Sequence, residues 1–138
     1  MAPNKAQREE LDHYSWEEGL LSRDADIAWQ KHYVVKVGHD LASAHWHLAD
    51  RDTGHRQGFR VMMTMFYTLK SEKQAARRRQ EVYAREYMAK MSEYGDWDRL
   101  DEFRKELQSR ARARQDAKAE ARQQAMQARM LVQQARGG

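Results

Sequence analysis

The chain is almost free of residues that interrupt a helix. Its 138 residues include one proline and seven glycines, and the segment from Trp97 to Arg136 contains neither. Proline and glycine are the residues that destabilise a helix interior most strongly. Ala, Arg, Gln, Glu and Met, which favour helices, are abundant, whereas Val, Ile and Thr are sparse. No alternation of apolar and polar residues is long enough to suggest a strand, so the sequence predicts an all-α protein.

A few residues that start or end helices divide the chain. Pro3 suits the first turn of a helix, and Ser22 or Asp24 can cap a second one. The clearest break is Asp50–Gly58, which holds two glycines. Gly95 is a natural residue for a helix end, and Asp96 is a natural cap for the helix that follows. We therefore predict helices over about residues 4–21, 24–49, 57–94 and 97–135.

These helices predict an antiparallel helical hairpin or small bundle, followed by a long Ala/Arg-rich C-terminal helix. We place a helical domain at residues 1–95 and a C-terminal helical arm at residues 96–138. The apolar seam of the arm beyond Leu107 consists mainly of alanines. Alanine buries little surface, so we expect this arm to be held in place by a partner.

The second predicted helix carries two apolar stripes at helical spacing. One stripe contributes to the predicted core, which comprises Ile27, Val34, Val37, Leu41, Leu48, Phe59, Met62, Phe66 and Leu69. The other stripe lies roughly 150° away around the helix. From it we predict partner contacts at His32, Val35, His39 and Trp46. The alternative is that Val35 and Trp46 are isolated exposed apolar residues, which are common on protein surfaces.

The sequence offers no catalytic or metal-binding motif. The absence of cysteine excludes disulfides, thiolate metal sites and cysteine nucleophiles. His32 and His39 are separated by about 10 Å along a helix, and His45 and His47 point in directions about 200° apart, so neither pair chelates one ion. No glycine-rich phosphate loop and no serine nucleophile motif occurs. We therefore predict a protein that is not an enzyme and binds no metal or cofactor.

Charge changes along the chain from acidic to basic. Residues 1–53 hold six Lys/Arg and ten Asp/Glu, a net charge of −4, whereas residues 108–138 hold seven and two, a net charge of +5. Basic residues on exposed helix faces can bind phosphates or the carboxylates of a protein partner. Eight arginines are predicted partner contacts: Arg77, Arg78, Arg79, Arg110, Arg114, Arg122, Arg129 and Arg136.

These features favour a non-catalytic structural or accessory subunit that contacts other protein subunits of a large complex through its helices. Mitochondrial respiratory and ATP synthase complexes contain many small helical subunits, so a peripheral, matrix-side location is the first hypothesis and the cytoplasm the alternative. The Arg-rich helices also permit an RNA-binding component of a ribonucleoprotein, although acidic residues interleave with the arginines. A third hypothesis is a self-associating coiled coil.

The chain shows no membrane or export signal at the level of sequence. Its longest apolar run, Val61–Leu69, is about half of a membrane span. Residues 1–16 are polar and include Glu9, Glu10 and Asp12, which is not the pattern of a secretory signal. We therefore expect neither a transmembrane segment nor secretion, although peripheral contact with a membrane complex is compatible with the sequence.

Overall fold

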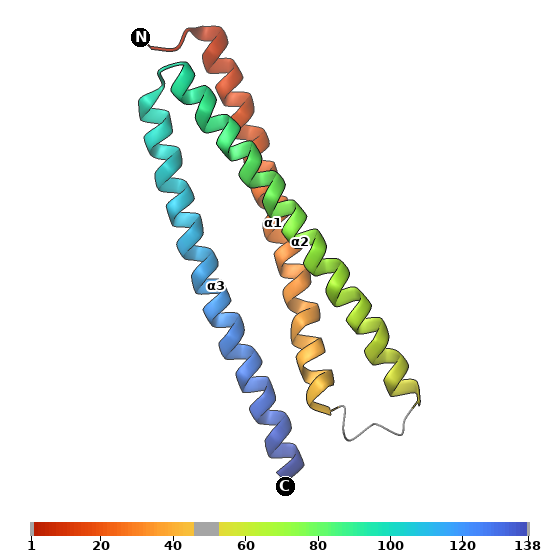
Figure 1. The fold of residues 1–138 in the computed structure, drawn as a ribbon. Coiled ribbons are helices and arrows are strands. Elements are labelled where there is room, and N and C mark those ends of the chain that lie inside the picture. Colours follow the sequence, from red (N-terminus) through yellow and green to blue (C-terminus); the bar gives the residue numbers. More distant parts are fainter. Residues whose placement is uncertain (1, 46–52, 138) are drawn as a thin grey trace. The chain divides into compact units, whose positions relative to one another are not determined.

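The computed structural model describes residues 2–45 and 53–137, and every regular element in these ranges is a helix. Helix α1 spans Lys5–His45, α2 spans Thr53–Glu93 and α3 spans Trp97–Gly137 (Figure 1). Each helix has 41 residues and is therefore about 60 Å long. The predicted all-α class, the helical hairpin formed by α1 and α2, and the long C-terminal helix are confirmed.

The predicted boundary between residues 21 and 24 is wrong, because α1 continues through it. Ser22 and Asp24 can cap a helix but do not force one to start, and Ser22 is buried on the inner face of α1. Gly19 weakens the helix by only about 1 kcal/mol, which tertiary packing outweighs. The start of α2 is also earlier than predicted, so Gly54 and Gly58 both fall inside its first turns.

Both ends of the connection between α2 and α3 are fixed by local hydrogen bonds. Gly95 has a φ of 72°, the left-handed conformation that glycine adopts without strain. The amide of Asp96 donates to the carbonyl of Met91 at 2.9 Å, and that of Gly95 donates to Ser92 at 3.2 Å. This pair is the Schellman pattern of a helix end. The Asp96 side chain then accepts from the Arg99 amide and caps α3, as the sequence predicted.

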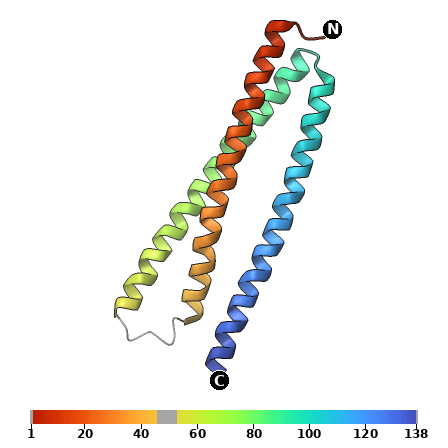
Figure 2. The same cartoon turned by 180° about the vertical axis from the view of Figure 1, so that it is seen from behind.

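The described chain forms two compact units, and each takes one segment from every helix. Unit 1 comprises residues 1–27 and 74–115, and unit 2 comprises residues 28–73 and 116–138. In unit 1 the first part of α1 lies beside the last part of α2 in both views of the ribbon (Figure 1 and Figure 2). The predicted division into a domain at residues 1–95 and an arm at residues 96–138 stays a prediction.

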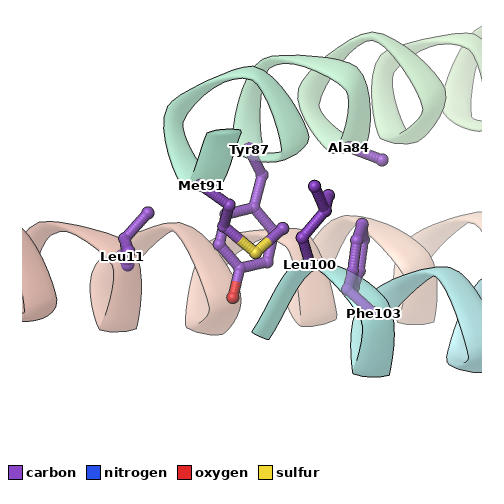
Figure 3. Close-up of a cluster of buried hydrophobic side chains, with 6 residues drawn as sticks. All are labelled: Leu11, Ala84, Tyr87, Met91, Leu100 and Phe103. Carbon is purple, nitrogen blue, oxygen red and sulfur yellow. The ribbon is translucent and has the colours of Figure 1, made fainter. Parts of the chain in front are cut away.

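The apolar core of unit 1 draws on all three helices. It consists of Leu11, Ala84, Tyr87, Met91, Leu100 and Phe103, all at most 5% exposed (Figure 3). The Tyr87 ring lies 4.9 Å from that of Phe103 and stacks on that of Tyr14 at 5.9 Å between centroids. Aromatic pairs at these separations add about 0.5–1.5 kcal/mol to the effect of burial. None of these six residues belongs to the core predicted from the sequence.

A buried carboxylate also links the three helices of unit 1. Glu18 of α1 is 2% exposed, and its carboxylate accepts a hydrogen bond of 2.8 Å from the amide of Gln80 in α2. Arg110 of α3 donates to both carboxylate oxygens of Glu18 and, at 2.8 Å, to Glu106. A buried charge is tolerated only when it is paired and hydrogen-bonded in this way. Glu18 therefore fixes how α1 is rotated against the other two helices.

The core predicted for α1 is wrong at Ile27 and Val34, which are 42% and 69% exposed. The buried stripe of α1 instead contains Glu18, Ala25 and His32, which repeat every seven residues. Ile27 and Val34 follow Ala25 and His32 by two positions, about 200° around the helix, and therefore point away from this stripe. Because the inner face holds polar and small side chains, hydrophobicity alone identified the opposite face.

The rest of the predicted core is partly confirmed. Val37, Met62, Phe66 and Leu69 are half-buried, and the side chains of the remaining three members lie outside the described residues. Those three are Leu41, Leu48 and Phe59.

We predict that Leu100→Ala lowers the free energy of unfolding by about 2–5 kcal/mol, because it leaves a cavity in the unit 1 core. Ile27→Ala should cost less than Leu100→Ala, about 1 kcal/mol, since Ile27 is 42% exposed whereas Leu100 is buried. Urea denaturation followed by circular dichroism measures both values. Equal losses in the two variants would show that the stripe assignment for α1 is wrong.

Glu18→Ala should lower the free energy of unfolding by about 2–4 kcal/mol, because it leaves the Arg110 guanidinium without its buried partner. The loss is below that of a fully buried pair, since Arg110 is 21% exposed and retains Glu106. Glu9→Ala, an exposed carboxylate on the same helix, is the matched control and should change stability by less than about 0.5 kcal/mol. Similar stability of the two variants in urea denaturation would contradict a linking role for Glu18.

Candidate binding sites

An apolar groove lies on the surface of unit 1 between α1 and α2. Its volume is about 510 Å³. It is lined by Leu21, Ala75, Arg78, Arg79, Val82, Tyr83 and Glu86, and we call it the arginine-rimmed groove. Val82 is 54% exposed although it is fully apolar. The floor is thus an accessible hydrophobic surface with charged side chains around it.

The three consecutive arginines of α2 differ in their surroundings. Arg77 turns inward, where it contacts Asp26 at 3.5 Å and Gln80 at 3.4 Å. Arg78 and Arg79 are exposed at the groove and form no ion pair with a described carboxylate. The two arginines of the block that lie at the groove are therefore available to a partner.

Two predicted contact arginines of α3 take part in the packing of unit 1. Arg110 already binds Glu18 and Glu106. Arg114 is half-buried, and burial together with the nearby charge of Arg77 lowers the pKa of its guanidinium. A role of these two side chains in partner binding stays a prediction.

Unit 2 contains a pocket of about 540 Å³ formed by all three helices. We call it the lysine pocket. Its lining residues are Trp29, His32, Tyr33, Lys36, Val37, Lys73, Lys118, Ala121, Arg122, Ala125, Met126 and Arg129. Ala121 and Ala125 line the pocket on α3, and their small side chains leave part of its volume open. Tyr33 donates a hydrogen bond to Gln124 and so ties α1 to α3 beside the pocket.

The lysine pocket gathers positive charge, and none of its described lining residues is a carboxylate. Lys36 comes from α1, Lys73 from α2, and Lys118, Arg122 and Arg129 from α3. Among the described residues, no carboxylate forms an ion pair with any of the three lysines. Burial, with the charges of Lys118, Lys36 and Lys70, lowers the pKa of Lys73. The pocket therefore holds like charges close enough to disfavour one another.

His32 is the buried polar group of this pocket. The residue is 6% exposed, and its ring lies 5.1 Å from that of Phe66. Its Nε2 atom has no hydrogen-bond partner among the described residues, which is uncommon for a buried polar atom. Burial first, and then the charges of Lys73, Lys36 and Lys70, lowers the pKa of His32 from 6.5 to about 4. The imidazole is therefore neutral at pH 7.

The structure brings together only part of the predicted contact set. His32, Arg122 and Arg129 line the lysine pocket, and Val35 is half-buried in unit 2. The side chains of His39, Trp46 and Arg136 lie outside the described residues. Because the His32 ring is buried, a partner reaches it only through the pocket.

Sequence reasoning missed most of the lysine pocket. Lys36, Lys73 and Lys118 stand on three different helices, and no spacing in the sequence links them. Trp29 and Tyr33 stack at 5.5 Å between centroids, and their spacing of four residues was the only available signal. That spacing shows that two rings share a helix face but not that three lysines face them.

The low pKa of His32 predicts a pH dependence of stability. Because 6.5 lies above the folded-state value of about 4, the unfolded chain takes up the proton first as the pH falls. The contribution of His32 is therefore complete above about pH 6.5 and is lost between pH 6.5 and 4. Imidazole proton shifts in NMR measure this pKa directly, and Lys73→Gln should raise it by removing a nearby positive charge. A value near 6.5 in the wild-type protein would contradict the buried, lysine-flanked position of the ring.

Two other classes of site are absent from the described residues. None of their helices has an apolar stretch long enough to cross a membrane. No group of three or more histidine, aspartate or glutamate side chains among them is placed to hold a metal ion. The chain matches no family model, no curated protein and no solved structure.

Proposed function

We propose that this protein is a non-catalytic helical subunit that binds another protein through the arginine-rimmed groove of unit 1. The observation that carries this proposal is the accessible apolar floor around Val82 beside two arginines without described ion pairs. Apolar surface flanked by charge is the usual composition of a protein interface. The Glu18 network and the aromatic core beneath the groove keep its walls in place.

The charges around the groove define the chemistry of the partner. Arg78 and Arg79 are consecutive residues that both line the groove. Glu86 follows Arg79 by seven residues, about 10 Å along the helix. Ala75 and Val82 of the groove are seven residues apart on α2. An amphipathic helix whose apolar residues alternate at spacings of three and four also repeats every seven residues, so its apolar stripe can pack along the floor. Carboxylates of that helix would pair with Arg78 and Arg79. The proposed partner is therefore an acidic amphipathic segment of another protein.

The finer hypotheses from the sequence stay predictions. A peripheral place on the matrix side of a mitochondrial respiratory or ATP synthase complex rests on the small helical type of the chain, and the cytoplasm is the alternative. RNA binding is the second candidate function. The concentration of positive charge in unit 2, with eleven Lys/Arg against six Asp/Glu, favours an anionic ligand there rather than at the groove.

Selection from a phage-displayed library of helical peptides tests the groove. We expect enrichment of peptides with apolar residues at three- and four-residue spacing and at least one Asp or Glu beside them. Val82→Asp should abolish their binding, because it places a charge on the apolar floor. The double variant Arg78→Glu/Arg79→Glu should bind them about tenfold more weakly, a difference of about 1.4 kcal/mol.

The controls separate the groove from general charge effects. Arg104→Glu/Arg112→Glu makes the same charge change at exposed positions of α3 and should leave peptide binding within about twofold. Peptides in which lysine replaces the acidic residue should bind the Arg78→Glu/Arg79→Glu protein better than the wild type. Circular dichroism shows whether each variant is folded. Enriched peptides that bind Val82→Asp as well as wild type would overturn the proposal.

A further inference from the structure

We propose that the lysine pocket of unit 2 is a binding site for a small polyphosphate anion. This inference goes beyond the proposed protein contact, because it concerns a different unit and a different set of residues. Two features carry it: positive side chains from three helices line one pocket, and the buried imidazole of His32, also in the lining, has a nitrogen without a described partner.

The convergence of like charges is the first feature. Lys73 is half-buried, Lys36 and Lys118 are exposed, and no described carboxylate pairs with any of the three. Packing alone does not favour this arrangement, because like charges held close together repel one another. A multivalent anion at the centre reverses the sign of the interaction for all three side chains at once. Phosphate groups suit such a site, since each offers several oxygens to ammonium donors.

The second feature is the buried, unpartnered Nε2 atom of His32 in the pocket lining. In the Nε2–H tautomer a neutral imidazole donates one hydrogen bond from Nε2, and a phosphate oxygen accepts such a bond. The same ring gains from a bound anion in another way, because a nearby negative charge favours the protonated form. Anion binding should therefore raise the pKa of His32, and the surrounding Lys36, Lys70 and Lys73 determine how far.

The size and walls of the pocket limit the ligand. A volume of about 540 Å³ is in the range of small-molecule sites, which is about 300–1,000 Å³. Trp29 and Tyr33 form one wall, and an aromatic face binds a planar ring by stacking. Both a nucleoside triphosphate and an inorganic polyphosphate can pair with the positive side chains of the pocket. Only the nucleoside triphosphate has a planar ring that can stack on the aromatic wall.

An extended nucleic-acid strand fits this geometry less well. Such a strand requires an exposed track of positive side chains that follows its phosphates. Here the positive side chains, of which Lys73 is half-buried, come from three helices and surround one pocket. A compact anion can contact side chains of all three helices together.

Isothermal titration calorimetry with the full chain tests the site, using ATP, inorganic tripolyphosphate and a ten-nucleotide single-stranded RNA. We expect ATP or tripolyphosphate to bind with one-to-one stoichiometry. Lys73→Gln/Lys118→Gln should weaken that binding at least tenfold. Lys5→Gln/Lys31→Gln removes two exposed lysines outside the pocket and should change it less than twofold.

Three further measurements distinguish the two ligand sources and separate this site from the groove of unit 1. If Trp29→Leu weakens ATP binding but not tripolyphosphate binding, the ligand is a nucleotide; equal effects on both assign an inorganic polyphosphate. NMR should show the pKa of His32 rising in the wild-type protein when the ligand is added. Val82→Asp in unit 1 should leave anion binding unchanged, which separates this site from the proposed protein contact.

The proposal is overturned if neither triphosphate binds at millimolar concentration, or if Lys73→Gln/Lys118→Gln binds as tightly as the wild type. It is also overturned if the RNA binds through these lysines while both triphosphates do not. That last result would instead support the RNA-binding hypothesis.

Discussion

The bidentate contact between Glu18 and Arg110 is the interaction on which the arrangement of unit 1 depends. An apolar core permits several rotations of a helix, because hydrophobic contacts are not directional. A buried carboxylate permits few rotations of its helix, since each carboxylate oxygen needs a hydrogen-bond donor from a neighbouring helix. Gln80 and Arg110 supply those donors from α2 and α3. The rotation of α1 in unit 1 is therefore set by hydrogen bonds as well as by hydrophobic burial.

The same rotation explains which side chains are left on the surface. With Glu18, Ala25 and His32 on the inner stripe, the positions two residues further along each turn outward. Leu20 and Ile27 are exposed in unit 1 for this reason, and Val34 is exposed in unit 2. An apolar side chain at the surface here is thus the consequence of a polar side chain in the interior.

Local patterns were sufficient to predict most of the fold, and nonlocal chemistry was not. The scarcity of helix breakers predicted the class, and Gly95 with Asp96 predicted the turn before α3, because each is decided by the backbone of a few residues. The inner face of α1 was not predictable, since burying Glu18 is favourable only once Gln80 and Arg110 are in place. The lysine pocket was missed for a related reason: its cations become neighbours only after the helices pack.

The buried polar groups of the two units differ in whether the described residues supply them with hydrogen-bond partners. In unit 1, whose residues hold fourteen Lys/Arg and fifteen Asp/Glu, the buried Glu18 obtains its partners from the protein itself. In unit 2, with a net charge of +5, the buried His32 has no described partner at Nε2, and the lysines around it face one another. Stability alone would favour a carboxylate among those lysines, because a single glutamate could pair with them. The proposed anionic ligand would account for the absence of a carboxylate among the described lining residues, since a resident carboxylate would occupy the same donors and repel the ligand.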